Sequence, residues 1–429
     1  MRKTSKKLRN LVIYQIYTRN FSESGDFQAI IDDLDRIKSL GVDYIYLLPI
    51  HPIGEKNKKG SLGCPYSIKD YTKVREELGG EKGLKQLIEV AHEKKLKVML
   101  DIVFNHTSRD SRLLTDHPEW FYHNENGEIA NKVGEWWDVC DLDFSSGKNL
   151  WFELLNVLVY FARLGIDGYR CDVASMVPID FWNLARKQVR HINRNFIWLS
   201  ESVHGAHCKH LRDSGFYCAS EAEIYQAFDM AYDYDVEPYM RDYLQGKAPL
   251  KPYLEGLKRQ EEIYPENYVK MHNLENHDFE RIAKEVNNDI DKIYNWTAFL
   301  FMQKGATMLY MGQEFASDLR PSLFDKELYP KHEDLSDFIS NLAKLKKRKV
   351  FAYGKYTVNI PEIDGVAYQV FESDTEVYQG IFNLGQVNGS LKVDLPDGKY
   401  RNYLTKKYVK VIDGEVKLIT DPIILKIKK

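Results

Sequence analysis

The sequence of 429 residues predicts an α/β protein: a closed barrel of eight parallel strands with interleaved helices, followed by a separate antiparallel β domain. Two observations carry this prediction. Short β-branched and aromatic runs alternate with helical patterns over about 350 residues, which is typical of repeated βα units. From about residue 353 the strand-like runs are separated by turn pairs such as Asp364-Gly365 and Asp413-Gly414, which favour β-hairpins.

The first part of the predicted barrel ends in a long irregular segment. Apolar residues recur at helical spacing over 26–40, and Gly41 is placed to end that helix. The stretch 104–147 is rich in Asn, Asp, His and Trp and exceeds the length of an ordinary βα loop, so we expect a small inserted domain there. The other elements expected before it are strands at 12–17, 44–48 and 97–101 and a helix at 80–95.

The alternation resumes after the insert. The expected helices are 148–164, 180–193 and 334–349, and the expected strands are 166–171, 196–201, 226–232, 268–273 and 306–310. We therefore assign residues 1–103 and 148–352 to the barrel, 104–147 to the insert and 353–429 to the C-terminal β domain.

Composition restricts the partners. Lys and Arg number 60 against 63 Asp and Glu, a net charge of −3, which argues against nucleic acid or an anionic membrane surface. The sequence has no apolar run as long as a membrane span. The five cysteines are scattered and the N-terminus lacks the apolar stretch of a signal peptide, so we expect a cytoplasmic protein with reduced thiols.

Four acids lie at or after the ends of predicted strands: Asp101, Asp172, Glu201 and Asp278. In a parallel barrel these ends form the active-site face, so the four carboxylates are expected to converge. Arg170, two residues before Asp172, is expected to keep one carboxylate ionised while another stays neutral and able to donate a proton. Glycoside hydrolysis uses such a pair.

The motifs around these acids resemble the four short regions of the α-amylase family of glycoside hydrolases, in the family's order and spacing. The insert resembles the family's domain B, residues 305–314 resemble its strand-eight region, and the tail resembles its C-terminal β-sandwich. The matching segments are Asp101-Ile102-Val103-Phe104-Asn105-His106, Gly168-Tyr169-Arg170-Cys171-Asp172, Glu201 and Asn276-His277-Asp278.

The resemblance implies a role for each matching residue. Asp172 corresponds to the nucleophile, Glu201 to the general acid/base, and Asp278 to the third carboxylate that grips the sugar hydroxyls. Tyr66 corresponds to the aromatic platform beneath the reacting sugar ring, and His204 is expected on the leaving-group side of the cleft. The residues expected to line the subsite of the distorted ring are Asp101, His106, Arg170 and His277.

Metal ligands are not expected. Asn105 matches a calcium ligand of some family members, but 173–177 lacks their Lys-His pair, and one amide cannot supply the roughly six to eight oxygens that calcium takes. We therefore expect no required cofactor. A second cluster offers residue types that bind zinc, but its spacing matches no tight ligand framework. Its members are His204, His207, Cys208, His210 and Cys218.

The expected activity is that of a retaining α-glucan hydrolase acting on starch, maltodextrin or malto-oligosaccharides. Residues 139–143 resemble α-amylases proper, whereas Val173 resembles neopullulanases and oligo-1,6-glucosidases, which favours α-1,4 cleavage with some tolerance of α-1,6 bonds. The alternatives are a transglycosylase of the same family and a catalytically inactive glucan-binding relative. Trp136 and Trp137 either stack on sugar rings or fill the core of the insert, and these two interpretations stay open.

Overall fold

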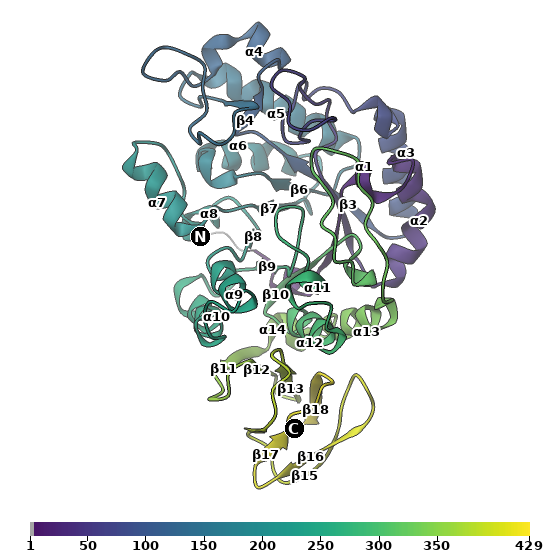
Figure 1. Cartoon of the computed structure of the whole chain (residues 1–429). Coiled ribbons are helices and arrows are strands. Elements are labelled where there is room, and N and C mark those ends of the chain that lie inside the picture. Colours follow the sequence, from purple (N-terminus) through teal and green to yellow (C-terminus); the bar gives the residue numbers. More distant parts are fainter. Residues whose placement is uncertain (1–3) are drawn as a thin grey trace.

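A closed barrel of eight parallel strands forms the centre of the protein, as a computed structural model of residues 4–429 shows (Figure 1). The strands follow the order β1-β10-β9-β8-β7-β6-β3-β2, so the first and last strands pair and close the barrel. This confirms the predicted barrel. Its strands are β1 (Val12–Ile16), β2 (Tyr44–Leu47), β3 (Lys97–Ile102), β6 (Gly168–Cys171), β7 (Ile197–Ser200), β8 (Met230–Tyr232), β9 (Lys270–His272) and β10 (Gly305–Tyr310).

Helices cover the outside of the barrel, so every residue of β1 and β10 is buried. Helix α2 shows how the sequence sets a boundary: the Asp26 side chain accepts a hydrogen bond from the Ala29 N–H at 2.9 Å, and Gly41 follows the helix at φ +84°. The longer helices are α2 (Phe27–Ser39), α3 (Gly80–Glu93), α5 (Lys148–Arg163), α6 (Ile179–Arg190), α7 (Gly205–Asp213), α9 (Glu237–Leu244), α10 (Lys251–Ile263), α12 (Ile290–Phe301) and α13 (Ser336–Lys346).

Sequence periodicity located no helix between residues 201 and 334, although α7, α9, α10 and α12 lie there. Helix α12 is buried on nearly all sides, so it has no polar stripe to reveal its period. The remaining short helices are α1 (Thr18–Phe21), α4 (Arg112–Asp116), α8 (Glu221–Ile224), α11 (Ile282–Glu285) and α14 (Lys349–Tyr353), with 3-10 turns at Lys6–Asn10, Glu76–Leu78, Pro118–Trp120, Ala174–Met176 and Gln313–Phe315. None of the helices within residues 4–429 combines the length and the apolar character needed to cross a membrane.

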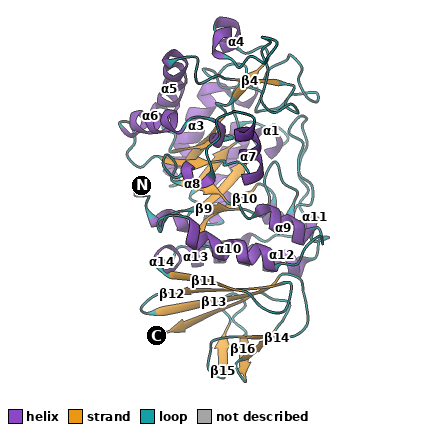
Figure 2. Cartoon of the chain, turned by 90° about the vertical axis from the view of Figure 1, so that its left-hand side faces the viewer, coloured by secondary structure: helices purple, strands orange, loops and turns teal. Residues whose placement is uncertain are grey.

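The segment after β3 forms a small two-stranded sheet at one end of the barrel. Strand β4 (His106–Ser108) pairs antiparallel with β5 (Val139–Asp141), and α4 lies beside them (Figure 2). A two-stranded sheet is only marginally stable alone, so its position depends on the barrel beneath it.

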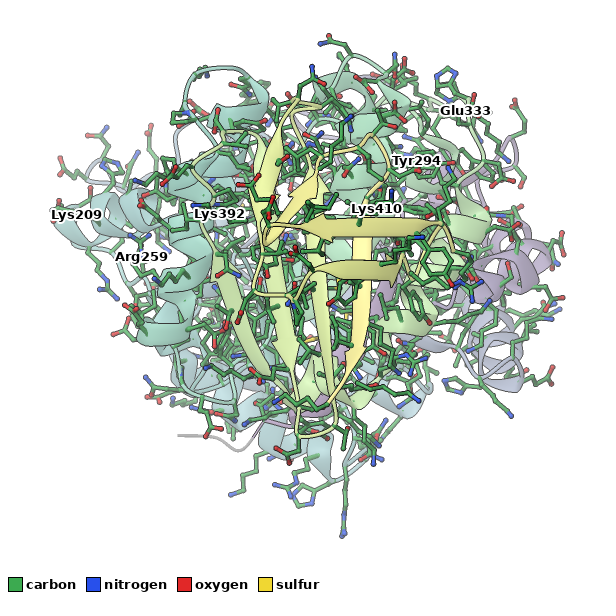
Figure 3. All side chains as sticks on the ribbon, turned by 90° about the horizontal axis from the view of Figure 1, so that it is seen from below. Lys209, Arg259, Tyr294, Glu333, Lys392 and Lys410 are labelled. Atoms are coloured by element: carbon green, nitrogen blue, oxygen red, sulfur yellow. The ribbon has the colours of Figure 1, made fainter. Side chains whose placement is uncertain are left out.

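Two antiparallel sheets form the C-terminal domain, as predicted. Their strands cross one another and enclose a core that includes Ile381, Val411 and Leu425 (Figure 3). The first sheet contains β11 (Lys355–Asn359), β12 (Val366–Glu372), β13 (Glu376–Asn383) and β18 (Ile423–Lys428). The second contains β14 (Ser390–Lys392), β17 (Glu415–Lys417), β16 (Tyr408–Ile412) and β15 (Gly398–Arg401).

Helix α12 joins the barrel to the C-terminal domain. The fully buried Asn295 accepts a hydrogen bond from the Asn383 N–H at 2.9 Å and donates one to the Thr420 carbonyl at 2.6 Å. Phe299 packs edge-on against Phe382, with ring centroids 5.6 Å apart. One helix therefore holds two segments of the β domain in place.

Replacing Asn295 with alanine should destabilise this junction. The Asn295→Ala variant leaves the buried N–H of Asn383 without its acceptor and removes one of the two donors to the Thr420 carbonyl, and we expect the free energy of unfolding to fall by about 1–3 kcal/mol in urea titrations. The control is Asn341→Ala on the exposed face of α13. Equal unfolding midpoints for the two variants would contradict this role of Asn295.

Candidate active site

A cavity of about 290 Å³ lies at the carboxyl ends of the barrel strands, where the sequence places the acids. Asp172 directly follows β6 and Glu201 directly follows β7, so neighbouring strands deliver both carboxylates to it. Its lining residues are Lys59, Cys64, Tyr66, His106, Trp136, Asp138, Val139, Asp172, Val173, Glu201, His277, Asp278, Leu323 and Phe324.

Arg170 lies beneath this cavity and is completely buried. Its Nη1 donates to an oxygen of Asp101 at 2.9 Å and to an oxygen of Asp172 at 2.8 Å. Its Nη2 lies 2.9 Å from Oε1 of Glu201. The expectation that Arg170 would distinguish one carboxylate from the other is therefore wrong, because the guanidinium contacts all three acids.

The environment of Asp172 favours its protonated form. Burial raises the pKa of this carboxyl well above its usual range, and the nearby Glu201 charge raises it further, while Arg170 opposes both effects. Asp172 therefore retains its proton to higher pH than an isolated carboxyl group would.

Asp278 reaches the cavity from a loop. The strand expected to end near it stops at His272, and a turn brings Asp278 back: the Asn276 side chain accepts hydrogen bonds from the N–H groups of Asp278 at 2.7 Å and Phe279 at 2.9 Å. Desolvation opposes ionisation of Asp278, but His277 and Arg170 outweigh it and hold the pKa of this carboxyl below its usual value. Asp278 is thus biased toward the ionised form, opposite to Asp172.

Tyr66 and His277 form one wall of the cavity. Their rings stack with centroids 5.3 Å apart, and the Tyr66 hydroxyl donates to Asp101 at 2.9 Å. The Gln15 amide lies 3.1 Å from Nδ1 of His277 and donates to it, which leaves Nε2, 3.1 Å from Asp278, as the nitrogen that carries the proton in the neutral ring. Tyr46 also donates to Asp101, at 2.6 Å.

The backbone after Asp172 is strained, and its N–H groups hold Glu201 in place. Val173 has φ +35°, a conformation uncommon for a β-branched residue that costs of order 1–3 kcal/mol. In this conformation its N–H donates to Oε2 of Glu201 at 2.9 Å, and the Ala174 N–H donates to the Glu201 carbonyl at 3.0 Å. Glu201 is therefore held from both its side chain and its backbone.

The inserted segment closes the cavity on another side. Burial lowers the pKa of His106 to about 4, so this ring is neutral near pH 7, with Nε2 at 3.9 Å from Asp172. Trp136 lines the cavity and its ring lies 5.4 Å from that of His106, while Trp137 is 57% exposed. Trp136 also packs on the small cluster of Met176 and Leu211, so it combines both interpretations, and Trp137 belongs to no core.

His204 does not line this cavity. Its ring stacks on Tyr234 at 4.9 Å and its Nδ1 bonds the Tyr234 carbonyl at 3.0 Å, beside a neighbouring cavity of about 680 Å³. Cys208 and Cys218 are buried with Met176 and Leu211. Across residues 4–429, the His, Cys, Asp and Glu side chains form no group of three placed to hold a metal ion.

The residues around Asn105 do not suit calcium. Its amide lies 3.4 Å from Asp141, whose other oxygen accepts the Lys132 N–H at 2.9 Å and lies 4.0 Å from the Lys132 ammonium. Burial raises the pKa of Asp141 to about 6, against the pull of Lys132. A neighbouring cation and a weakly acidic carboxyl make poor partners for an ion that takes about six to eight oxygens.

Sequence motifs missed the rim of the cavity. Lys59 and Asp138 form an ion pair at 2.9 Å, and the Lys59 ammonium lies 4.3 Å from the Trp137 ring centroid. Phe324 is held there because its carbonyl accepts the Leu62 N–H at 2.9 Å. These residues come from separate loops, and only the aromatic pair at 136–137 indicated that part of the rim before the fold was known.

The raised pKa of Asp172 predicts a pH-dependent change in stability. A carboxyl with a raised folded pKa binds more protons folded than unfolded, so stability falls as pH rises above about 3.9, the unfolded value. Asp172→Asn removes this loss, and its Tm should rise relative to wild type by about 1–3 °C between pH 5 and pH 8. Asp374→Asn, at an exposed turn, is the control; a parallel pH profile for Asp172→Asn and wild type would contradict the prediction.

Comparisons with known proteins identify the family of the chain. The family model of the alpha amylase catalytic domain matches residues 15–356, and that of the bacterial alpha amylase C-terminal domain matches 358–425. The crystal structure of an alpha-amylase from Lactobacillus plantarum is 41% identical, with a TM-score of 0.94 over 99% of this chain and 100% of that one. A noncanonic maltogenic alpha-amylase, AmyB from Thermotoga neapolitana, is 31% identical, with a TM-score of 0.87 over 99% of this chain and 100% of that one.

Curated sequences match over less of their length. An intracellular maltogenic amylase of Bacillus subtilis is 26% identical over 344 residues, which are 76% of this chain and 55% of that protein. The chain spans about half the length of the curated relatives that it matches, at 41%, 58% and 55% in three cases. With a barrel of matching topology and family models that cover both of its domains, the chain belongs to the alpha-amylase family of glycoside hydrolases.

Proposed function

We propose that the protein is a retaining α-glucan hydrolase that cleaves α-1,4-glucosidic bonds of starch, maltodextrin or malto-oligosaccharides. One observation carries the proposal: Asp172 and Glu201 leave adjacent strands, face the same cavity and share the guanidinium of Arg170. Retaining glycosidases place their two carboxyl groups about 5–5.5 Å apart, so that one attacks the sugar while the other handles the proton.

The reaction proceeds by double displacement. Asp172 attacks the anomeric carbon while Glu201 protonates the leaving oxygen, and a glycosyl-enzyme forms with Asp172. Glu201 then takes a proton from water, which attacks the same carbon and frees Asp172 with the configuration retained. Double displacement requires the proton on Glu201, from which the leaving oxygen takes it, and an ionised Asp172 that attacks the sugar.

The remaining cavity residues bind the sugar in this proposal. Ionised Asp278 accepts hydrogen bonds from the ring hydroxyls, and the ring N–H groups of His106 and His277 donate to them. The Tyr66 ring offers an apolar face to the sugar, while Asp101 holds Tyr66 and Arg170 in position. His204 and Tyr234, in the neighbouring cavity, border the leaving-group side.

The names of two relatives and the residue after Asp172 support the proposed substrate range and location. The maltogenic activity in the name of the Thermotoga relative supports short α-1,4-glucans as substrates. We infer some tolerance of α-1,6 bonds from Val173, and we infer that water rather than a second sugar is the main acceptor. The name of the Bacillus subtilis relative supports a cytoplasmic location, as do the five free cysteines of residues 4–429.

Two substitutions separate the proposed roles of the carboxylates. Asp172→Asn and Glu201→Gln should each lower turnover of maltoheptaose more than about 10³-fold, measured by chromatography of the products. On α-maltosyl fluoride, whose leaving group needs no protonation, Glu201→Gln should recover the first step as a burst of fluoride, and Asp172→Asn should not.

The matched control is Glu262→Gln on the exposed face of α10, which should keep wild-type turnover. Near wild-type activity in either active-site variant would contradict the roles assigned to Asp172 and Glu201. Products longer than maltoheptaose would identify a transglycosylase instead, and no change of the sugar by the wild-type protein would identify a binding protein. Digestion of pullulan tests the α-1,6 tolerance.

We also propose that turnover needs no metal ion. Dialysis against EDTA should leave both maltoheptaose turnover and Tm unchanged, because the carboxyl closest to Asn105 already faces Lys132. A loss of activity that added Ca²⁺ restores would contradict this.

A further inference from the structure

A second cavity, of about 620 Å³, lies at the opposite end of the barrel from the carboxylates. It is formed by the end of α6, the loop that follows it and the start of β7, beside the segment that precedes β8 (Figure 1). Four cations line it: Arg186, Lys187, Arg190 and Arg194. The other lining residues are Asn183, Asn193, Phe196, Trp198 and Gln226.

The positive charge of this cavity is largely uncompensated. Its lining includes neither Asp nor Glu, and Asp229 contacts the cluster from behind, at 2.8 Å from Nη2 of Arg186. Of the four cations, Arg186 is the one bonded to this carboxylate in the contact given above, and Lys187, Arg190 and Arg194 are exposed on the cavity wall. A concave surface with about three spare positive charges attracts small anions.

The helix dipole accounts for only part of the cluster. Lys187 and Arg190 stand in the last turn of α6, where cations complement the helix end. Arg194 lies beyond the helix. Arg186 is only 7% exposed, stacked 5.5 Å from the Trp198 ring, and its Nη1 is buried without a hydrogen-bond partner. A buried donor of this kind is costly unless something supplies an acceptor.

We propose that this cavity binds the phosphate group of a phosphorylated sugar. A phosphate dianion supplies acceptors for the forks of Arg190 and Arg194, which match phosphate oxygens in pairs, and the buried charge of Arg186 behind them adds to the attraction. The amides of Asn183, Asn193 and Gln226 both donate and accept, as sugar hydroxyls require. The volume lies within the range of about 300–1,000 Å³ of small-molecule sites.

A long polyanion fits less well. The chain as a whole has a net charge of −3, and the cations gather in one hollow rather than along a stripe. The proposal is independent of glucan hydrolysis, because the site shares no lining residue with the cavity of Asp172 and Glu201.

Calorimetric titration of the full chain tests the site with four probes: glucose 6-phosphate, glucose 1-phosphate, inorganic phosphate and glucose. We expect at least one ester to bind with 1:1 stoichiometry and a Kd about tenfold or more below that of inorganic phosphate, with no heat from glucose. Saturable binding by neither ester, or equal affinity for ester and inorganic phosphate, would overturn the proposal.

Variants place the binding in this cavity. Arg190→Gln and Arg194→Gln should each weaken the ester about tenfold. Both side chains are exposed, whereas Arg186 is buried and bonded to Asp229, so its replacement would also disturb the fold. The control is Arg259→Gln, which changes an exposed arginine of α10 (Figure 3) and should keep wild-type affinity. Unchanged ester binding in a variant that carries both substitutions, or binding of heparin but of no ester, would contradict the assignment.

Discussion

The contact of Arg170 with three acids is the constraint on which the active-site end of the barrel depends. A guanidinium that is fully buried is tolerable only when charged partners surround it, and these partners come from three successive strands of the barrel wall, β3, β6 and β7. Asp101 is the register partner of Arg170 across β3 and β6. A slip of one residue between these strands would turn Arg170 to the other face and leave its partners unpaired.

The same contact fixes the electrostatics of the cavity. Arg170 lies between the rings of Tyr66 and Tyr232, at 5.8 and 5.6 Å from their centroids, so it cannot turn away. Asp172 and Asp278 then acquire opposite tendencies from their surroundings: the first is pressed against another acid, and the second is beside a histidine. The charges face the substrate position before any sugar arrives, and little reorganisation remains for the reaction itself.

Sequence reasoning reached the barrel because its signals are local. Most barrel strands are short runs dominated by apolar residues, and Asp172 and Glu201 directly follow two of the strands. It did not reach the features that tertiary contacts decide. Asp278 is returned by a turn that Asn276 builds, Val173 adopts a conformation that its residue type disfavours, and Lys59 meets Asp138 from a distant loop. His204 follows Glu201 closely in sequence, yet its ring turns to Tyr234.

The pairing of β1 with β10 affects how the chain folds during its synthesis. The edge of β1 finds its partner only when the chain has been made almost to the end of the barrel, so a ribosome-bound chain carries an open parallel sheet with an apolar edge for most of its synthesis. Helix α12 is made just before β10, and the C-terminal sheet that packs on this helix is made after it. The cavity walls are therefore completed late in folding. A chain truncated before β10 would keep an unpaired apolar edge, which favours aggregation, and would lack a complete substrate cavity.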